Sequence, residues 1–420
     1  MLRSGILLGA LLLMSPHLPA AELSVESAER LVSVRRAADF FAREADWILQ
    51  QQIRVTSIPA PPFREEERAR YLEEQFRALG LLNVRRDSIG NVLGERPGAD
   101  PEHIVVLSAH MDTVFPEGTD IEIRREGDNW VGPGISDNGA GLAALLSLAR
   151  ALEESNLRTS AALLFVANVG EEGEGDLRGM RALFADAGLR RRVRAVIALD
   201  GSSAERLTTK ALGSKRFLVT VRGPGGHSWS DFGLPNPIQV LARAVSRLTA
   251  VTLPQQPRTV LNIGEIHGGT SVNAIPYEAW MKVDIRSELE SEIERLEQAL
   301  RTALGEAVAE ENSWARTKGV GLGVEVRTIG HRPAGELPAN ARIIEVFRAV
   351  DNRLGIQTTI QRSSTDANIP ISLGIEAVAV GGGGRSGASH SLREWYDPSG
   401  RELGLRRILL ALALLAGVEE

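Results

Sequence analysis

Cysteine is absent from the 420 residues of this chain, and its absence limits both cross-linking and metal chemistry. No disulfide can form, and no thiolate is available to bind a metal. Histidine nitrogens and carboxylate oxygens are therefore the strong metal ligands that remain to this protein.

An excess of positive charge is also lacking. The formal net charge is -6 at pH 7, with lysine and arginine interspersed among the acids. Such a chain has no basic stripe of the kind that binds phosphate backbones, so we expect no nucleic-acid partner. Hydrophobic residues make up 43% of the chain, enough for one large core and a second domain. We expect a soluble globular protein that acts on small molecules or peptides.

No apolar run is long enough to cross a membrane comfortably, because a spanning helix needs about 20 apolar residues. The N-terminus instead has the pattern of an export signal, with Arg3 before the apolar stretch 6–14 and small residues near 18–21. The alternative is an uncleaved anchor. We expect residues 1–21 to be a signal peptide and the protein to be periplasmic or secreted, without stable membrane insertion. The apolar run 408–415 is predicted to be the buried face of a helix.

Buried strands alternate with helices up to about residue 210. Apolar runs at 104–109, 161–169 and 195–199 lack the polar alternation of a one-sided sheet. Residues 139–152 carry the broad apolar face of a helix. The alternation resumes after Pro333. We predict an α/β catalytic domain formed by residues 22–212 and 331–420, with a mainly parallel sheet and helices on both faces.

The pattern changes between residues 213 and 330. The predicted order is strand, helix, strand, strand, helix, strand, at 216–221, 237–248, 259–266, 277–285, 288–304 and 324–329. This is the order of the ferredoxin-like βαββαβ unit. We therefore predict that a lid or dimerisation domain of residues 213–330 interrupts the first domain.

Several metal-binding side chains lie at the ends of the predicted strands or beside them. They are His110, Asp137, Glu171, Glu172, Asp200 and His390. Loops at the carboxyl ends of the strands converge in an open α/β sheet, so we expect these side chains to lie close together. Taken singly, each has an ordinary alternative as a cap, a turn residue or a solvated side chain. Together, the imidazoles and carboxylates form a ligand set suited to two divalent, zinc-like ions.

Asp112 lies two residues beyond His110. Its carboxylate is placed to accept the second imidazole N–H and so to fix the tautomer of the ring. The alternative is a side chain that caps a turn. The sequence alone leaves both roles open.

Five segments resemble, in order, the successive motifs of the co-catalytic zinc peptidase family. They are 108–114 (SAHMDTV), 134–141 (GISDNGAG), 170–173 (GEEG), 199–201 (LDG) and 388–391 (ASHS). That family includes tripeptide aminopeptidases, glutamate carboxypeptidases, aminoacylases and the deacylases of acetylornithine and succinyl-diaminopimelate. The likeness runs across nearly the whole predicted mature chain. Asn138 and the segment 363–368 resemble the tripeptidase-like branch more closely.

The resemblance implies a role for each candidate residue. The implied ligands of two ions are His110, Asp137, Glu172, Asp200 and His390, with Asp137 as the bridge. One ion would be completed by His110 and Asp200, and the other by Glu172 and His390. Glu171 would be the general base toward a hydroxide held between the ions, supported by Asp112 near His110.

Three further residues lie in segments that resemble lid motifs of the same family, at 223–228, 268–276 and 283–286. His227, in the segment 223–228, would reach the active site of a partner subunit and stabilise the developing oxyanion. Asn273 would line the site, and Arg286 would receive a substrate carboxylate, which suits the planar fork of a guanidinium. The ordinary alternatives are a loop histidine, a turn residue and a salt bridge between Arg286 and lid acids.

The hypothesis that follows is a dizinc hydrolase that cleaves a peptide or amide bond in short peptides, as a tripeptidase-like or carboxypeptidase-like exopeptidase. A deacylase of N-acyl amino acids is the nearest alternative. From a different class, a non-catalytic peptide-binding protein would keep the fold, but such a protein is expected to have lost ligands. The resemblance also implies a homodimer formed through the lid domain.

Overall fold

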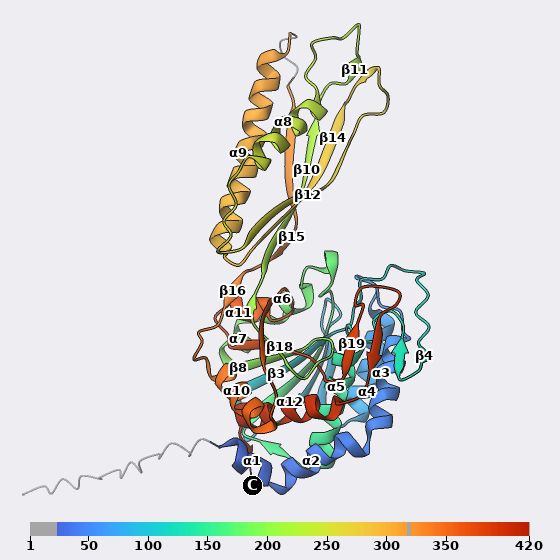
Figure 1. The fold of residues 1–420 in the computed structure, drawn as a ribbon, viewed down its shortest axis with the longest axis vertical. Coiled ribbons are helices and arrows are strands. Elements are labelled where there is room, and N and C mark those ends of the chain that lie inside the picture. The colour runs from blue at the N-terminus through green and yellow to red at the C-terminus, as the bar shows by residue number, and fades with distance from the viewer. Residues whose placement is uncertain (1–22, 317–320, 420) are drawn as a thin grey trace, which may run out of the picture.

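The computed structural model describes residues 23–316 and 321–419, so the predicted signal peptide at 1–21 lies outside the described residues. Two large sheets organise the chain (Figure 1). No helix in the described ranges is long and apolar enough to cross a membrane.

The larger sheet has nine strands in the order β1-β2-β7-β3-β8-β18-β9-β16, with β17 paired to β9. Its strands are β1 Leu82–Arg86, β2 Val92–Arg96, β3 Asp100–His110, β7 Ala161–Asn168, β8 Val193–Leu199, β9 Arg206–Ala211, β16 Gly335–Glu336, β17 Thr359–Ser363 and β18 Ala377–Val380. The central strands β7, β3, β8 and β18 are parallel, whereas β1 and β2 pair antiparallel at one edge. The predicted α/β class with a mainly parallel central sheet is confirmed.

Helices surround this sheet and supply most of its core. They are α1 Val25–Arg30, α2 Val32–Arg43, α3 Ala45–Thr56, α4 Glu66–Ala78, α5 Gly139–Glu154, α6 Arg178–Ala185, α7 Ala187–Arg192, α10 Arg342–Leu354, α11 Asn368–Ser372 and α12 Arg401–Ala416. The helices α5, α10 and α12 form one contiguous layer against the sheet. The α12 helix contains the apolar run 408–415, whose residues are almost all buried, as the sequence predicts.

The second sheet, called here the lid sheet, has the strand order β12-β14-β10-β15. It consists of β10 Gly213–Arg222, β12 Thr259–Gly268, β14 Glu278–Ser287 and β15 Gly323–Arg332, with helices α8 Pro237–Thr249 and α9 Glu290–Trp314 packed on it. The order and the antiparallel pairing match the predicted ferredoxin-like unit. The lid sheet extends away from the larger sheet, and β11 Gly226–His227 lies near its far end (Figure 1).

Small elements complete the described chain. A four-stranded sheet contains β4 Arg124–Glu126, β5 Asn129–Val131, β19 Arg385–Gly387 and β20 Trp395–Asp397. Two pairs of short strands are β11 with β13 Ala274–Ile275, and β6 Arg158–Thr159 with β21 Val418–Glu419. A single 3₁₀ turn, Gly173–Gly175, follows the two glutamates that come after β7.

Candidate metal centre

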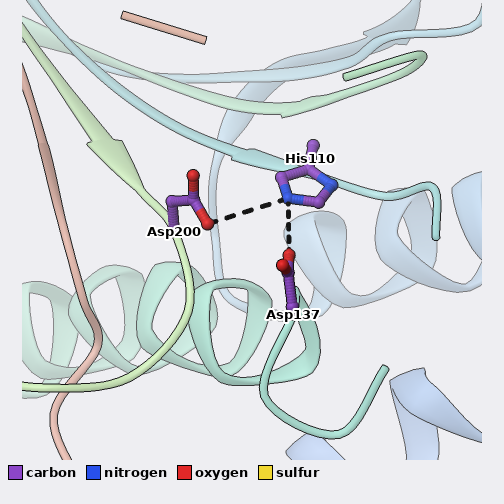
Figure 2. A group of neighbouring side chains, drawn as sticks. All are labelled: His110, Asp137 and Asp200. Carbon is purple, nitrogen blue, oxygen red and sulfur yellow. Dashed lines mark ion pairs between the residues drawn. The ribbon is translucent and has the colours of Figure 1, made fainter. Parts of the chain in front are cut away.

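The predicted ligands meet at the carboxyl edge of the central strands. His110 is the last residue of β3, Asp200 follows β8, and Asp137 precedes α5. His110 Nε2 lies 3.2 Å from Asp137 Oδ1 and 4.0 Å from Asp200 Oδ1, as Figure 2 shows. These three side chains come from separate elements, so the sheet topology brings them together.

Asp137 also belongs to a second group. His390 Nε2 lies 3.2 Å from Asp137 Oδ2 and 3.0 Å from Glu172 Oε1. In each group the potential ligand atoms lie within 4.8 Å of one another. The two groups therefore share Asp137, which is the arrangement that two ions bridged by one carboxylate require.

A third potential ligand group contains His110, Glu171 and Glu172. Within it the two glutamates differ in their partners. Glu172 faces His390, whereas Glu171 Oε1 accepts a hydrogen bond from Arg332 Nη1 at 3.1 Å. The side chain of Glu171 is buried and engaged by a guanidinium, so its environment distinguishes it from its neighbour.

Burial and opposite charges set the protonation of the cluster. Burial raises the pKa of Asp200 to about 6, and the nearby Asp137 adds to this. Burial acts in the same direction on Asp137, but its interactions with the His110 and His390 imidazoles outweigh burial and lower the pKa of that carboxyl. Hydrogen bonds with Asp137 and Glu172 raise the pKa of His390 to about 10.

Two other members of the cluster are shifted. Burial lowers the pKa of His110, but the carboxylates of Asp112 and Asp137 outweigh burial and raise it well above its usual value. Burial raises the pKa of Glu171 well above its usual value, although Arg332 opposes this. Buried acids and imidazoles packed this closely are typical of functional sites.

The donor set fits divalent cations. Asp137 Oδ1 is buried and has no hydrogen-bond partner among the described residues, so a carboxylate oxygen is free to bind a cation. Two imidazoles and three carboxylates match the ligand preferences of zinc-like ions. The residues that would hold two such ions are His110, Asp137, Glu172, Asp200 and His390.

Asp112 has a contact that the sequence did not predict. Its carboxylate accepts hydrogen bonds from the backbone N–H groups of Glu171 at 2.9 Å and Glu172 at 2.7 Å. His110 Nδ1 instead lies 3.1 Å from the Asp112 carbonyl oxygen, and 3.7 Å from the carboxylate, which is too long for a hydrogen bond. Asp112 therefore fixes the loop that carries both glutamates, and its backbone carbonyl is the partner of the imidazole.

Two residues that hold the ligand loops in place were not predicted from the sequence. The buried Glu394 accepts hydrogen bonds from the backbone N–H groups of Gly134, Ser136 and Asp137, and from the Ser136 hydroxyl. Arg332, the last residue of β15, holds both the side chain and the carbonyl oxygen of Glu171. Neither residue stands in a motif that signals such a role, because both contacts join distant parts of the chain.

Asn138 joins the two loops that carry Asp137 and Asp200. Its side-chain oxygen accepts the N–H groups of Gly141 at 3.1 Å and Gly201 at 3.0 Å, and its amide donates to the Leu199 carbonyl at 2.9 Å. The sequence singled out this position only as a family difference. The structure shows that an amide there satisfies donors and acceptors on both sides.

The lid residues are divided between two places. Arg286 lines a cavity of about 550 Å³ together with His110, Asp137 and Glu171, and its Nε donates to Asp284 at 2.8 Å. The predicted alternative, an ion pair with a lid acid, is therefore present. His227 and Asn273 are exposed, lie near each other on the lid, and do not line this cavity.

A central parallel sheet with a shared histidine and carboxylate cluster at its edge, interrupted by a four-stranded lid sheet, defines the class of two-metal hydrolases. Comparison with known proteins agrees. Residues 106–414 match the model of peptidase family M20/M25/M40, which covers more than half of the chain. The chain belongs to this family.

Individual relatives are more distant. Thermostable carboxypeptidase 1 of Saccharolobus solfataricus is 27% identical over 58% of this chain and 64% of that protein. The chain spans between 53% and 64% of the length of the first curated relatives it matches.

Solved structures share the fold. The aminopeptidase PepT of Bacillus cereus has a TM-score of 0.71 at 21% identity, covering 88% of this chain and 98% of that one. The YXEP protein of Bacillus subtilis, described as a dinuclear metal binding peptidase, has a TM-score of 0.64 at 16% identity, covering 90% and 99%.

Proposed function

We propose that this protein is a two-metal exopeptidase that hydrolyses a peptide or amide bond in short peptides, with zinc as the native metal. The observation that carries the proposal is the pair of ligand groups that share Asp137, next to a glutamate engaged by an arginine. Membership of the peptidase family supports the same reaction class.

Two divalent ions, when bound by the five ligands, would polarise the scissile carbonyl and lower the pKa of water. Glu171 takes the proton of the attacking water and passes it to the leaving amine. Arg332 and Asp112 hold this glutamate through its side chain and its backbone N–H. The cavity of about 550 Å³ has room for a short peptide and provides Arg286 to bind a carboxylate.

The test is hydrolysis by metal-reconstituted protein of di- and tripeptides beside N-acetyl and N-succinyl amino acids. We expect cleavage of peptides and loss of activity on chelation. In Glu171→Gln, kcat/KM should fall about 10²- to 10⁴-fold, because proton transfer is removed, while the bound metal per chain is unchanged. Faster cleavage of N-acyl amino acids would favour the deacylase alternative. Metal binding with no hydrolysis of either set would favour a peptide-binding protein.

We also propose that the active form is a homodimer built through the lid. The β12 strand forms an outer edge of the lid sheet, pairing only with β14 among the described residues, and it exposes Val260 and Ile266. An unpaired edge with apolar side chains is a surface suited to association. His227 then acts on the active site of the partner subunit. If light scattering gave the mass of a monomer and that monomer were fully active, this arrangement would be contradicted.

We also propose that the protein is exported, because residues 1–21 have the pattern of a signal peptide. We expect the mature protein to be recovered from a periplasmic or culture fraction. N-terminal sequencing should then begin near Ala21 or Glu22. A cell-associated protein that kept Met1 would contradict cleavage.

A further inference from the structure

The cavity beside the metal centre is rich in arginine. Five arginines line it, namely Arg206, Arg216, Arg286, Arg332 and Arg362. A wall of this kind matters only where the positive charges are not already neutralised by acids. Their ion pairs therefore decide which of them can receive a substrate group.

Two of these arginines are neutralised. Arg332 pairs with Glu171 at 3.1 Å, and Arg362 pairs with Glu336 at 2.9 Å and with Glu288 at 3.4 Å. Neither has a charge to offer a ligand. Arg362 is therefore a lining residue whose charge is matched within the protein.

The two lid arginines share one acid. Arg216 Nε lies 3.2 Å from Asp284 Oδ1, and Arg286 Nε lies 2.8 Å from Asp284 Oδ2. Two guanidinium groups facing one carboxylate leave one positive charge in excess. This excess is available to a first carboxylate of the substrate, in keeping with the function proposed above.

Arg206 has a different environment. Its Nη2 donates to two backbone carbonyls, those of Asp200 at 3.3 Å and Ser202 at 3.0 Å, and it forms no ion pair with an acid among the described residues. Gly201 leaves room for this group, because a Cβ there would lie 2.9 Å from Nη2. The remaining Nε and Nη1 donors bond to no protein acceptor in the described ranges, so both are free to donate to a ligand.

Arg206 also lies between two cavities. Besides the one of about 550 Å³, it lines a second of about 700 Å³, and both cavities are bordered by Asp137 and Asp200. A substrate group that lies near the metal centre in either cavity is therefore near Arg206. Its backbone is held in turn, since Arg407 Nη1 donates to the Arg206 carbonyl at 2.8 Å.

We infer that Arg206 binds a second anionic group of the substrate and that the enzyme prefers peptides with an acidic side chain in a residue flanking the scissile bond. The inference rests on the proposed peptidase function. Two positive charges that no acid pairs with face the same cavity. One belongs to the Arg216 and Arg286 pair and the other to Arg206, so a ligand with two carboxylates neutralises both. A guanidinium donor that has no protein partner forms a strong, charge-assisted hydrogen bond with a carboxylate.

A structural role is the competing explanation. By bonding two carbonyls of the loop after β8, Arg206 also helps to position Asp200. That role would affect all substrates equally and would weaken metal binding. Substrate-selective effects separate the two explanations.

The test compares the isosteric pairs Ala-Glu with Ala-Gln and Glu-Ala with Gln-Ala on zinc-loaded protein. Wild-type enzyme should prefer the acidic member of at least one pair by about 10- to 100-fold in kcat/KM. Arg206→Met should abolish this preference, chiefly by raising KM for the acidic member of the pair. Arg206→Lys should keep part of the preference, and the matched control Arg362→Met should keep it in full.

Binding provides a readout that does not depend on turnover. Calorimetry on zinc-loaded Glu171→Gln protein should show Ala-Glu or Glu-Ala binding more tightly than its amide partner, and the added substitution Arg206→Met should remove the difference. An unchanged preference in Arg206→Met would overturn the inference. Equal losses for acidic and amide peptides with lower zinc content would assign Arg206 a structural role. If no peptide is cleaved, the proposed function fails, and the calorimetry still decides the role of Arg206.

Discussion

At the scale of single residues, Glu394 has a larger part in the metal centre than its place outside every ligand group indicates. Its Oε1 accepts three hydrogen bonds, from Ser136 N, Ser136 Oγ and Asp137 N, and its Oε2 accepts the N–H of Gly134. In Glu394→Gln an amide NH₂ would face the N–H of Gly134, leaving a donor without an acceptor. A buried unpaired donor costs about 1–3 kcal/mol.

We expect Glu394→Gln to weaken zinc binding about 10- to 100-fold, as losses of groups that support ligands commonly do. Titration against a competing chelator would measure this. The exposed Glu402 offers a control, and Glu402→Gln should bind zinc as wild type does. Equal affinities in all three proteins would show that other contacts suffice to hold the Asp137 loop.

Asp366 gives a prediction about pH. Burial raises its pKa to about 7 from an ordinary 3.8, and one carboxylate oxygen has no partner among the described residues. Because the folded state holds this proton more tightly than the unfolded state, its contribution to stability is lost as pH rises from about 4 to about 7. Asp366→Asn removes the titrating group.

The unfolding free energy of wild type should therefore fall more steeply than that of Asp366→Asn over this window, by up to about 1.4 kcal/mol per pH unit. Urea unfolding in the presence of a chelator would measure both profiles, so that bound cations do not shift the carboxyl. Above about pH 7 the two profiles should run parallel. Parallel profiles throughout would mean that Asp366 is ionised in the folded protein below pH 4.

Most of the ligands could be predicted from the sequence, because they follow a buried apolar run or precede a strong helix. His110, Glu172 and Asp200 are of this kind. The contacts of Glu394 and Arg332 could not, because each joins residues more than 100 positions apart. For Asp112 the sequence left open a bond to the His110 imidazole or a capping role. The carboxylate accepts hydrogen bonds from backbone N–H groups of a distant loop, which local spacing does not reveal.

At the scale of elements, the long buried strands and amphipathic helices followed from their patterns, whereas short exposed strands did not. Strands such as β4 and β19 have only three residues each and few buried side chains, so no periodicity marks them. The antiparallel edge formed by β1 and β2 was likewise unpredicted, since β1 is largely exposed. Pairing partners of such strands depend on the packed sheet beside them.

A buried ion pair joins two helices of the layer behind the site. Arg407 on α12 bonds Asp351 on α10 at 2.6 Å and 2.7 Å, and both side chains are 1% exposed. Removing one partner leaves the other charge buried without compensation. We expect Arg407→Met to destabilise the protein by about 3–5 kcal/mol.

The double variant Asp351→Leu with Arg407→Met removes both charges, so much of this loss should be recovered. Urea unfolding of the two single variants and the double variant would measure the coupling. If the double variant were as unstable as the sum of the single variants, packing rather than charge would explain the loss.

At the scale of the whole molecule, hydrogen bonds connect the lid to the loop that carries Glu171, the proposed general base. The strands β10 and β15 enter and leave the lid, and both contact the loop after β7. Arg216 donates to the Gly173 carbonyl at 3.1 Å, the N–H of His331 donates to Asp176 at 2.8 Å, and Arg332 holds Glu171. A change in the angle of the lid therefore acts directly on the segment that carries Glu171.

The same architecture places His227 far from the metal centre of its own chain, because β11 lies near the far end of the lid sheet (Figure 1). If His227 serves a partner subunit, a chain with an intact His227 can rescue a chain that lacks it. We expect inactive Glu171→Gln and inactive His227→Ala proteins to regain activity when they are mixed and allowed to exchange subunits. Each mixed dimer then has one complete site, formed by Glu171 of one chain and His227 of the other.

Random exchange makes half of the dimers mixed, so the recovered activity should approach about one quarter of wild type. Two different affinity tags would isolate the mixed dimers and confirm that they form. A mixture of Glu171→Gln with the double variant Glu171→Gln and His227→Ala is the control, and it should stay inactive because no chain supplies the base. Mixed dimers without activity would show that His227 does not act on the partner subunit. Such a dimer contains both Glu171 and His227, but in different chains, so a site built from one chain alone would stay incomplete.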